Sequence, residues 1–253
     1  MKSIEMANIV SIKNITDNIC DMVLKCPDIV KNARAGQFIE LYPDNGENIL
    51  ARPISICKID KAEETIRIVF QIVGKGTKQF SELKTGDKIR VLGPCGNGYE
   101  FSEANNTTIL VGGGIGIPPL LEACNQIKGQ KIVVLGFRSE AFLVNEFEEA
   151  GAKVYIATDD GSAGFKGNVV ELLKHENIKG DVIYSCGPKI MLKSLSAWAK
   201  ENNTTCYVSM EERMACGIGA CVGCVVQIKD GDGFIYKKVC KDGPVFNSEE
   251  VLW

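Results

Sequence analysis

The chain has 253 residues, of which 45% are hydrophobic and 24% charged, an ordinary balance for a globular protein with two domains or one large one. Its 29 basic and 32 acidic residues give a net charge of −3 without long blocks of one sign, which argues against a nucleic-acid or anionic-lipid partner. No apolar run reaches membrane-spanning length and the N-terminus lacks the apolar core of a secretory signal, so we expect a cytoplasmic protein.

The N-terminal part of the chain is rich in short β-forming runs bounded by turn residues, among them Ile9–Ile12, Gln37–Leu41 and Thr65–Phe70. One short helical stretch, Thr77–Leu83, follows them. Several strands at this spacing predict a small antiparallel β-barrel, which we place at residues 1–101.

Two segments of this predicted barrel carry residues suited to phosphate. Arg52-Pro53-Ile54-Ser55 offers a rigid guanidinium fork, a fixed backbone and a hydroxyl. Gly74-Lys75-Gly76-Thr77 precedes the short helix and can present backbone N–H groups. Taken alone, each segment reads first as a structural turn. Followed by a nucleotide fold and a metal-binding segment, they predict a flavin site.

After the polar stretch Ser102–Asn106, a predicted linker, β and α units alternate with short loops. The predicted strands span residues 108–111, 131–135, 153–157, 181–185 and 204–209. The predicted helices span residues 118–127, 141–150, 167–173 and 188–200. This alternation predicts a doubly wound parallel sheet over residues 102–209.

A glycine-rich turn joins the first strand of this region to its first helix. Its glycines are Gly112, Gly113, Gly114 and Gly116. A pyrophosphate binds at such a place on backbone amides and a helix N-terminus. The dinucleotide fingerprint G-x-G-x-x-G is not met, because Ile117 stands where its third glycine belongs. The turn alone is a weak signal, and its place between strand and helix is what favours nucleotide binding.

Two further strand ends of this region are candidates for the same ligand. Cys186-Gly187-Pro188 opens a helix at a carboxyl end, where open α/β sheets bind ligands, although a cysteine there can also simply pack. Asp159 and Asp160 follow another strand. They could accept ribose hydroxyls and repel a 2′-phosphate, favouring NAD over NADP, or they could form a solvated turn.

Residues 210–253 carry the most specific pattern. Cys216, Cys221 and Cys224 have the spacing C-x4-C-x2-C, and fifteen residues separate Cys224 from Cys240. This is the plant-type arrangement for a [2Fe–2S] cluster, with the last cysteine closer than usual. A zinc site is the alternative, although only one pair has the C-x2-C spacing of zinc hooks. The 11 cysteines are an odd number in a chain too long to need disulfides, which indicates a reducing compartment.

The glycines and alanines between the first three cysteines would let the backbone wrap around a cluster and direct amide N–H groups at sulfur. Behind them, Val225–Ile228 and Phe234–Val239 flank a glycine-containing turn and predict a hairpin. The only histidine, His175, lies in a predicted solvated helix end, so a histidine general base is not expected.

The motifs together resemble the signature of the ferredoxin reductase superfamily; they are Arg52–Ser55, Gly74–Thr77, Gly112–Gly116 and Cys186–Pro188. The cysteine-containing run from Cys216 to Cys224 indicates one family within this superfamily. Over essentially its whole length the chain is similar to the electron-transfer subunits of the two-protein, NAD-dependent (type B) dihydroorotate dehydrogenases of pyrimidine biosynthesis.

The resemblance implies a role for each matching residue. FAD would be held by Arg52, Pro53, Ile54, Ser55, Val69, Phe70, Gln71, Gly76 and Thr77. The [2Fe–2S] cluster would be ligated by Cys216, Cys221, Cys224 and Cys240. NAD would be positioned by the glycines of the turn at 112–116 and by Cys186, Gly187 and Pro188, with the nicotinamide near Cys186 and FAD.

The resemblance also implies a partner, an FMN-containing catalytic subunit, in a heterotetramer with two copies of each subunit. Electrons would pass from FMN through the cluster and FAD to NAD+, and no acid–base side chain of this chain would be needed. Met214, Ile218 and Val222 would edge the docking face, unless they are buried within the subunit.

Three alternatives stay open at this stage. In a sister family, the small subunits of NADH-dependent ferredoxin:NADP oxidoreductase and sulfide dehydrogenase, an Asp replaces the first cluster cysteine, which here is Cys216. A redox-sensing regulator without turnover and a structural zinc protein are the others.

Overall fold

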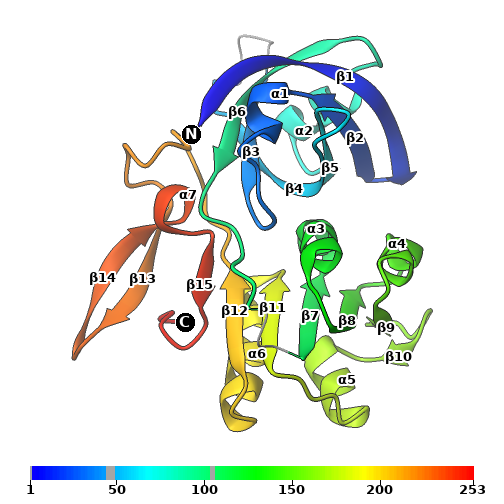
Figure 1. Cartoon of the computed structure of the whole chain (residues 1–253), viewed down its shortest axis with the longest axis vertical. Coiled ribbons are helices and arrows are strands. Elements are labelled where there is room, and N and C mark those ends of the chain that lie inside the picture. Colours follow the sequence, from blue (N-terminus) through cyan, green and yellow to red (C-terminus); the bar gives the residue numbers. More distant parts are fainter. Residues whose placement is uncertain (1, 44–48, 103–105) are drawn as a thin grey trace. The chain divides into compact units, whose positions relative to one another are not determined.

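The structure, a computed structural model, describes residues 2–43, 49–102 and 106–253 (Figure 1). Residues 103–105 of the predicted linker lie outside this description. The chain forms two compact units. The first unit contains Met1–Gly98, Glu212–Val226 and Lys237–Pro244. The second contains Tyr99–Glu211, Gln227–Tyr236 and Val245–Trp253. The C-terminal segment is thus shared between the units, and the division at residues 101 and 209 stays a prediction.

The first unit is built on a closed antiparallel barrel, which confirms the predicted fold class of the N-terminal part (Figure 1). Its strands are β1 (Ser3–Thr16), β2 (Ile19–Lys25), β3 (Phe38–Tyr42), β4 (Arg52–Asp60), β5 (Thr65–Gln71) and β6 (Lys88–Cys95). They pair in the order β1-β2-β5-β4-β3-β6, and β1 also pairs with β6, so no edge is left open.

Alternating side chains of these strands fill the barrel. Met22 and Leu24 of β2 and Ile66 and Ile68 of β5 are fully buried, as the two-residue period of a strand requires. Two short helices, α1 (Pro27–Val30) and α2 (Lys75–Ser81), pack against the barrel core through buried side chains.

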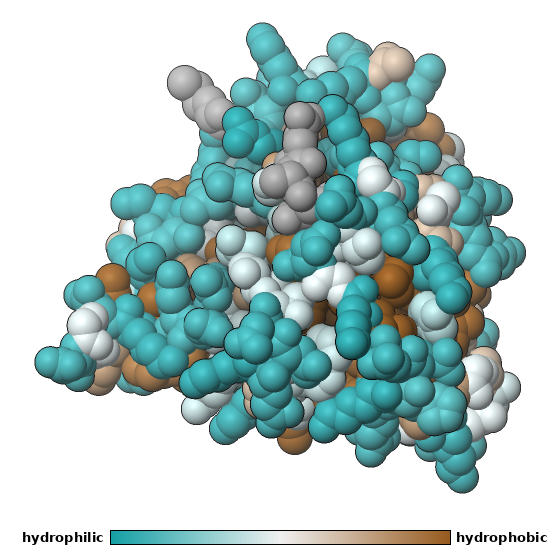
Figure 2. Space-filling view, turned by 60° about the horizontal axis from the view of Figure 1, so that its bottom comes forward, coloured by the Kyte–Doolittle hydropathy of each residue, from teal (hydrophilic) through white to brown (hydrophobic). Residues whose placement is uncertain are grey.

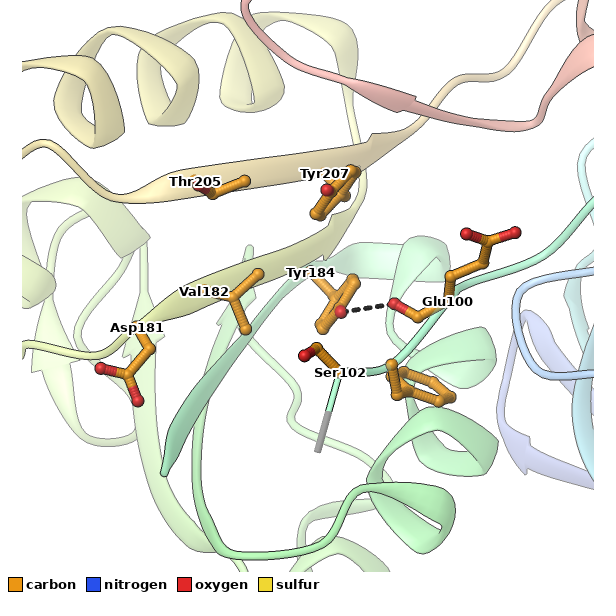
Figure 3. Close-up of a pocket in the computed structure, with 8 residues that line it drawn as sticks. Glu100, Ser102, Asp181, Val182, Tyr184, Thr205 and Tyr207 are labelled. Carbon is orange, nitrogen blue, oxygen red and sulfur yellow. Dashed lines mark hydrogen bonds between the residues drawn. The ribbon is translucent and has the colours of Figure 1, made fainter. Parts of the chain in front are cut away.

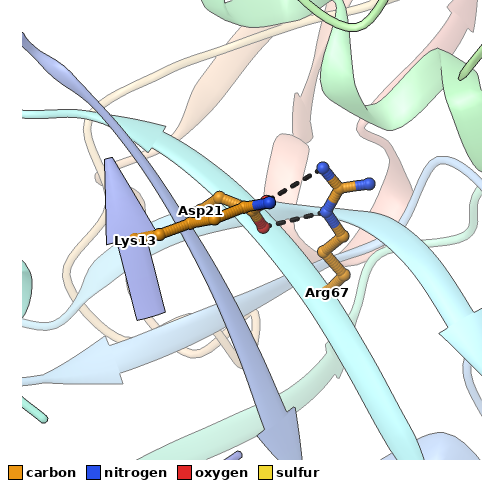
Figure 4. Close-up of polar contacts among 3 residues, drawn as sticks. All are labelled: Lys13, Asp21 and Arg67. Carbon is orange, nitrogen blue, oxygen red and sulfur yellow. Dashed lines mark hydrogen bonds and ion pairs between the residues drawn. The ribbon is translucent and has the colours of Figure 1, made fainter. Parts of the chain in front are cut away.

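An ion pair stabilises the barrel between β2 and β5 (Figure 4). Asp21, 5% exposed, accepts hydrogen bonds from Nε and Nη2 of Arg67 at 2.8 and 2.9 Å. Lys13 of β1 approaches the same carboxylate at 4.0 Å. The bidentate geometry and the burial of the carboxylate make this pair stronger than an exposed one.

The second unit contains a seven-stranded sheet in the order β10-β9-β8-β7-β11-β12-β15. Its strands are β7 (Thr107–Gly113), β8 (Gln130–Phe137), β9 (Lys153–Thr158), β10 (Phe165–Lys166), β11 (Val182–Cys186), β12 (Thr205–Ser209) and β15 (Val245–Asn247). All neighbours are parallel except β15, which runs antiparallel to β12. The predicted parallel sheet is confirmed, and the antiparallel edge strand from the C-terminal segment was not foreseen.

The helices of this unit are α3 (Pro118–Gln126), α4 (Val144–Glu149), α5 (Val169–His175) and α6 (Lys189–Glu201), with a 3₁₀ turn, η1, at Gly114–Gly116. Right-handed crossovers place α3 and α4 on one face of the sheet and α5 and α6 on the other, because the strand order reverses after β9. The reversal leaves a switch point between β7 and β11, where open sheets bind ligands.

Capping residues decide two helix boundaries that periodicity placed differently. The predicted helix at 141–150 begins only at Val144, because Leu143 adopts a left-handed conformation with φ of 62°. The predicted helix at 167–173 begins after Asn168, whose Oδ1 accepts from the N–H groups of Val170 and Glu171.

The C-terminal segment adds the predicted hairpin, formed by β13 (Val225–Asp230) and β14 (Gly233–Lys238), and a short helix, α7 (Val239–Asp242). Hydrophilic side chains cover most of the face drawn in Figure 2, with hydrophobic residues in separate patches between them. Among the residues placed by the structure, no helix combines the length and apolar character needed to cross a membrane.

Candidate cofactor-binding sites

The two phosphate-binding segments predicted in the barrel meet at its α2 end. Arg52, the first residue of β4, lies against Gly76 in the first turn of α2. A Cβ atom at position 76 would stand 2.9 Å from Nε of Arg52, so the guanidinium occupies the space that any larger residue would need. Nη1 of Arg52 donates to the carbonyl oxygen of Leu50 at 2.5 Å. The structure therefore places a cation against the first turn of a helix, a pairing that suits a phosphate.

The hydroxyl of Thr77 holds the turn that precedes α2. Its Oγ1 accepts hydrogen bonds from the N–H groups of Val73 and Gly74 at 3.0 and 3.2 Å and donates to the Gly74 carbonyl. Thr77 therefore shapes the turn with its side chain, and its role toward FAD stays a prediction.

The other predicted FAD residues divide by the face of the strand on which they lie. Phe70 packs in the barrel core, with its ring 6.4 Å from that of Phe80 and nearly perpendicular to it. Ile54 also packs against this core. Pro53 and Ser55 alternate with Ile54 along β4 and are half-buried. Any contact of Phe70 with a cofactor would therefore be made by its backbone.

The four cysteines of the C-terminal segment approach each other as two pairs within the first unit. The N–H of Cys221 points at the Sγ of Cys216 at 3.4 Å, and Cys224 and Cys240 form the second, buried pair. Among the described residues, no three side chains of the metal-binding types form one group. Two pairs of thiolates fit a binuclear cluster, in which each iron takes two protein ligands.

The loop between the first two cysteines is shaped for sulfur. Gly217 and Gly219 have φ values of 62° and 82°, which glycine adopts without strain. Burial opposes ionisation of Cys216, yet the N–H groups of Cys221, Ile218 and Ala220 lower the pKa of its thiol to about 6. Backbone amides directed at this sulfur are the arrangement expected around a thiolate ligand.

Cys240 has the opposite environment. Burial, and then the adjacent Cys224, raise the pKa of its thiol to about 12. Cys240 lies in α7, which is joined to the loop by a hydrogen bond from Val239 N to the Cys224 carbonyl at 2.8 Å. A metal ion would supply the positive charge that a thiolate needs in this buried place.

Sequence reasoning missed two residues that contact the cluster segment. Nζ of Lys2 donates to the carbonyls of Gly217 and Cys240, at 2.8 and 3.0 Å, and so ties together the loop and the distant fourth cysteine. Glu40 of β3 is 1% exposed, and its carboxyl oxygens have no hydrogen-bond partner among the described residues. The sequence feature that could have identified Glu40 is a charged residue inside a β-forming run. No sequence feature distinguished Lys2.

The desolvated position of Glu40 raises the pKa of its carboxyl to about 7, and the nearby Cys216 adds to this effect. A Cβ atom at position 217 would stand 2.8 Å from Cγ of Glu40, so the cluster loop packs directly on this side chain. Only glycine at 217 permits that approach.

The predicted NAD segments of the second unit come together at its switch point. Gly112 and Cys186 are direct neighbours across β7 and β11. A Cβ atom at Gly116 would stand 2.5 Å from the carbonyl oxygen of Cys186, so the two loops touch through their backbones. Met191 of α6, which sequence reasoning did not single out, covers Gly113.

The remaining predicted NAD residues lie at the carboxyl ends of β11 and β9, which are separated in the sheet by β7 and β8. The side chain of Cys186 is buried, and burial raises the pKa of its thiol, so it stays protonated and serves packing. Asp159 and Asp160 are exposed after β9, which β8 separates from β7. Hydrogen bonds from the hydroxyl and N–H of Ser162 lower the pKa of Asp160. A role in binding ribose stays a prediction.

A hollow of about 340 Å³ in the second unit lies beside β11 and β12 (Figure 3). It is lined by residues of β11 and β12, including Tyr184 and Tyr207, whose rings stack at 5.5 Å. The hydroxyl of Tyr184 donates to the Glu100 carbonyl at 2.6 Å. Because Asp181 and Thr205 at its rim mark strand beginnings, this hollow is distinct from the switch-point crevice.

A barrel, a doubly wound sheet and a four-cysteine segment define a flavin- and iron–sulfur-dependent reductase, and comparisons with known proteins agree. A family model described as an oxidoreductase FAD-binding domain matches residues 6–99. A second, described as the iron–sulfur cluster binding domain of dihydroorotate dehydrogenase B, matches residues 211–252.

Two curated relatives carry the name dihydroorotate dehydrogenase B (NAD(+)), electron transfer subunit. The protein from Caldanaerobacter subterraneus is 42% identical over 98% of both chains, and that from Bacillus cereus is 42% identical over 96% of both. A solved structure of NADH-dependent reduced ferredoxin-NADP oxidoreductase matches with a TM-score of 0.88 and 32% identity, covering 98% of this chain and 90% of that one.

The chain belongs to the family of dihydroorotate dehydrogenase B electron-transfer subunits. It is an oxidoreductase subunit with an FAD-binding domain and an iron–sulfur cluster binding domain, as the sequence predicted.

Proposed function

We propose that this chain passes electrons between an FMN-containing dihydroorotate dehydrogenase catalytic subunit and NAD+. The observation that carries the proposal is the location of the four cysteines. They belong to the same compact unit as the barrel with Arg52 and Gly76, so one unit carries both the cluster ligands and the proposed flavin site. The names of the curated relatives support the substrate and the coenzyme.

When bound, FAD exchanges both hydride and single electrons, whereas the cluster exchanges single electrons only. The protein's residues bind and orient these groups. Arg52 would offer its guanidinium to an FAD phosphate beside Gly76, and Pro53 and Ser55 lie on the face of β4 opposite Ile54. Cys216 with Cys221, and Cys224 with Cys240, would each hold one iron.

In the second unit, the backbone of the turn at 112–116 and the Cys186–Pro188 turn would hold the pyrophosphate and nicotinamide ends of NAD. Asp159 and Asp160 would accept the ribose hydroxyls and repel a 2′-phosphate. No acid–base side chain is required, which agrees with the exposed position of His175 at the end of α5.

The partner would dock over the cluster loop. Ile218 and Val222, between the cysteines, are 53% and 72% exposed, and Met214 is half-buried. Apolar side chains exposed beside a redox centre are typical of a protein interface. A heterotetramer with two copies of each subunit is part of this proposal.

The runner-up function is that of the small subunit of an NADH-dependent ferredoxin:NADP oxidoreductase. The solved structure with a TM-score of 0.88 favours it. Cys216 at the first ligand position and the higher identity to the dihydroorotate dehydrogenase relatives favour the first proposal.

A reconstitution experiment separates the two functions. The anaerobically purified chain is expected to show flavin bands and a broad cluster shoulder that NADH bleaches, with iron and labile sulfide present and zinc absent. NAD+ reduction is then measured with the FMN-containing subunit plus dihydroorotate, and with reduced ferredoxin instead. Reduction driven by ferredoxin alone would contradict the first proposal.

A further inference from the structure

A hollow lined by basic side chains lies on the first unit, next to the segment that carries Cys240. Its volume is about 530 Å³. The cationic residues that line this basic hollow are Lys2, Lys31, Arg34, Lys61 and Lys241. No acidic residue of the described chain lines it, although the protein as a whole has a net charge of −3. Composition therefore does not explain this local excess of positive charge.

None of the five cations forms an ion pair with an acidic side chain that the structure describes. Two carboxylates of the turn around Lys61 are engaged elsewhere: Glu64 pairs with Lys25 at 3.6 Å, and Asp60 accepts from the N–H groups of its own turn. Like charges left unpaired around one hollow repel each other, and an anionic occupant would relieve that repulsion.

The walls of the basic hollow are fixed by hydrogen bonds. The Gln37 side chain accepts from Arg34 N at 2.8 Å and donates to the Gly96 carbonyl at 2.6 Å. Asn97 donates to the carbonyls of Asp242 and Gly243, at 3.0 and 2.7 Å, which joins the end of β6 to the cluster segment. The hollow is thus a built feature of the barrel and the cluster segment together.

The basic hollow also borders the cluster ligands and the exposed apolar loop. Lys2 donates to the Cys240 carbonyl at 3.0 Å, and Lys241 follows Cys240 in α7. Gly219, next to the exposed Ile218, packs against the Lys241 side chain. Electron transfer between bound cofactors falls steeply with distance, so a partner that exchanges electrons with the cluster has to cover this side of the unit.

We propose that the basic hollow is the docking site for an acidic segment of the catalytic partner subunit. This inference rests on the proposed function. It adds that positive charge on this chain selects and orients the partner subunit. Lys31, Arg34, Lys61 and Lys241 are exposed, so each binds a free ion weakly in water. Carboxylates fixed together on a protein surface meet all of these cations at once and steer association.

The test uses the FAD- and cluster-loaded chain with its purified catalytic subunit. Lys31→Glu/Lys61→Glu is compared with Lys58→Glu/Lys84→Glu, which makes the same charge change at exposed positions of the same unit outside the hollow. We expect the hollow variant to weaken subunit association by more than about tenfold at low salt, and the difference to shrink as salt is added. NADH oxidation by ferricyanide, which needs no partner, checks that the cofactor sites are intact.

The possible outcomes are distinct. Equal association of both double variants with the catalytic subunit would overturn the docking inference while leaving the proposed function standing. Saturable binding of pyrophosphate by the free chain, lost in the hollow variant while subunit association is unchanged, would assign the hollow to a small anion and also overturn it. A wild-type chain that never associates with the dihydroorotate-oxidising subunit would refute the proposed function and this inference together.

Discussion

At the scale of single residues, function depends on a few side chains placed against glycine. Gly76 admits the Arg52 guanidinium, and Gly217 admits the Glu40 carboxyl. In each case the missing Cβ leaves room for an ionisable side chain, which lies against a segment where a cofactor is expected. These contacts join positions far apart in the sequence.

Arg52→Ala should weaken FAD retention. A hydrogen bond from a charged group contributes about 1.5–3 kcal/mol, so the dissociation constant of FAD should rise by roughly tenfold or more. Flavin fluorescence after dialysis measures the loss. Arg90→Ala, which removes an exposed arginine lying over the Tyr42 ring in the same barrel, serves as the control. Equal flavin occupancy in both variants would remove Arg52 from the FAD site.

Glu40→Gln should stabilise the cluster-free chain more at high pH than at low pH. Because burial raises the folded-state pKa of Glu40 to about 7, the folded state prefers the protonated carboxyl. The stability that the folded state gains from the protonated Glu40 carboxyl is fully present below the unfolded-state pKa. That stability is lost as pH rises through the folded-state pKa. The Glu40→Gln variant should therefore have a higher free energy of unfolding than the wild type. This difference should grow by on the order of 2 kcal/mol between about pH 5 and about pH 8.

Urea denaturation at several pH values measures this difference. Glu63→Gln, the same substitution in an exposed turn of the same barrel, is the control. An advantage of Glu40→Gln that is constant with pH would show that the carboxyl is ionised without penalty in the folded protein.

At the scale of secondary-structure elements, the cluster loop and α7 act as one element. The hydrogen bond from Val239 to the Cys224 carbonyl sets α7 against the loop, and Cys240 thereby reaches Cys224. The short spacing between these two cysteines is spanned by the β13–β14 hairpin, which returns the chain to the loop.

Cys221→Ser should abolish cluster absorbance and partner-dependent NADH formation while FAD is retained, because the residues proposed to hold FAD lie on the barrel strands and α2. The visible spectrum and the coupled assay with the catalytic subunit measure both effects. Cys124→Ala, a change at a buried cysteine of α3 in the second unit, should leave the spectrum unchanged. Coupled activity at the wild-type level in Cys221→Ser would refute the role of the loop.

At the scale of the whole molecule, Lys2, near the N-terminus, contacts the cluster segment within the first unit. Lys2 precedes the first strand, and the carbonyls it binds lie 215 and 238 residues further along the chain. Lys2 therefore holds the cluster segment on the barrel, and the first unit combines segments from early and late parts of the chain.

Lys2→Met should loosen the cluster. It removes two hydrogen bonds, each contributing about 1 kcal/mol, so cluster absorbance should decay up to about thirtyfold faster in the presence of a chelator. Lys2→Arg should restore much of the lifetime because it keeps the charge and the donors, and Lys58→Met is the surface control. If the methionine variant keeps its cluster as long as the wild type, the hydrogen bonds of Lys2 do not stabilise the cluster segment.

The sequence by itself determined the elements whose pattern is local. Alternating hydrophobic runs located strands of the barrel and sheet, and cysteine spacing identified the cluster segment, because each depends on neighbours along the chain. Only the tertiary structure decided that β15 pairs antiparallel with β12, that Lys2 binds the Cys240 carbonyl, and that five separate cations surround one hollow. These features join residues with no common periodicity or motif, so the folded backbone alone brings them together.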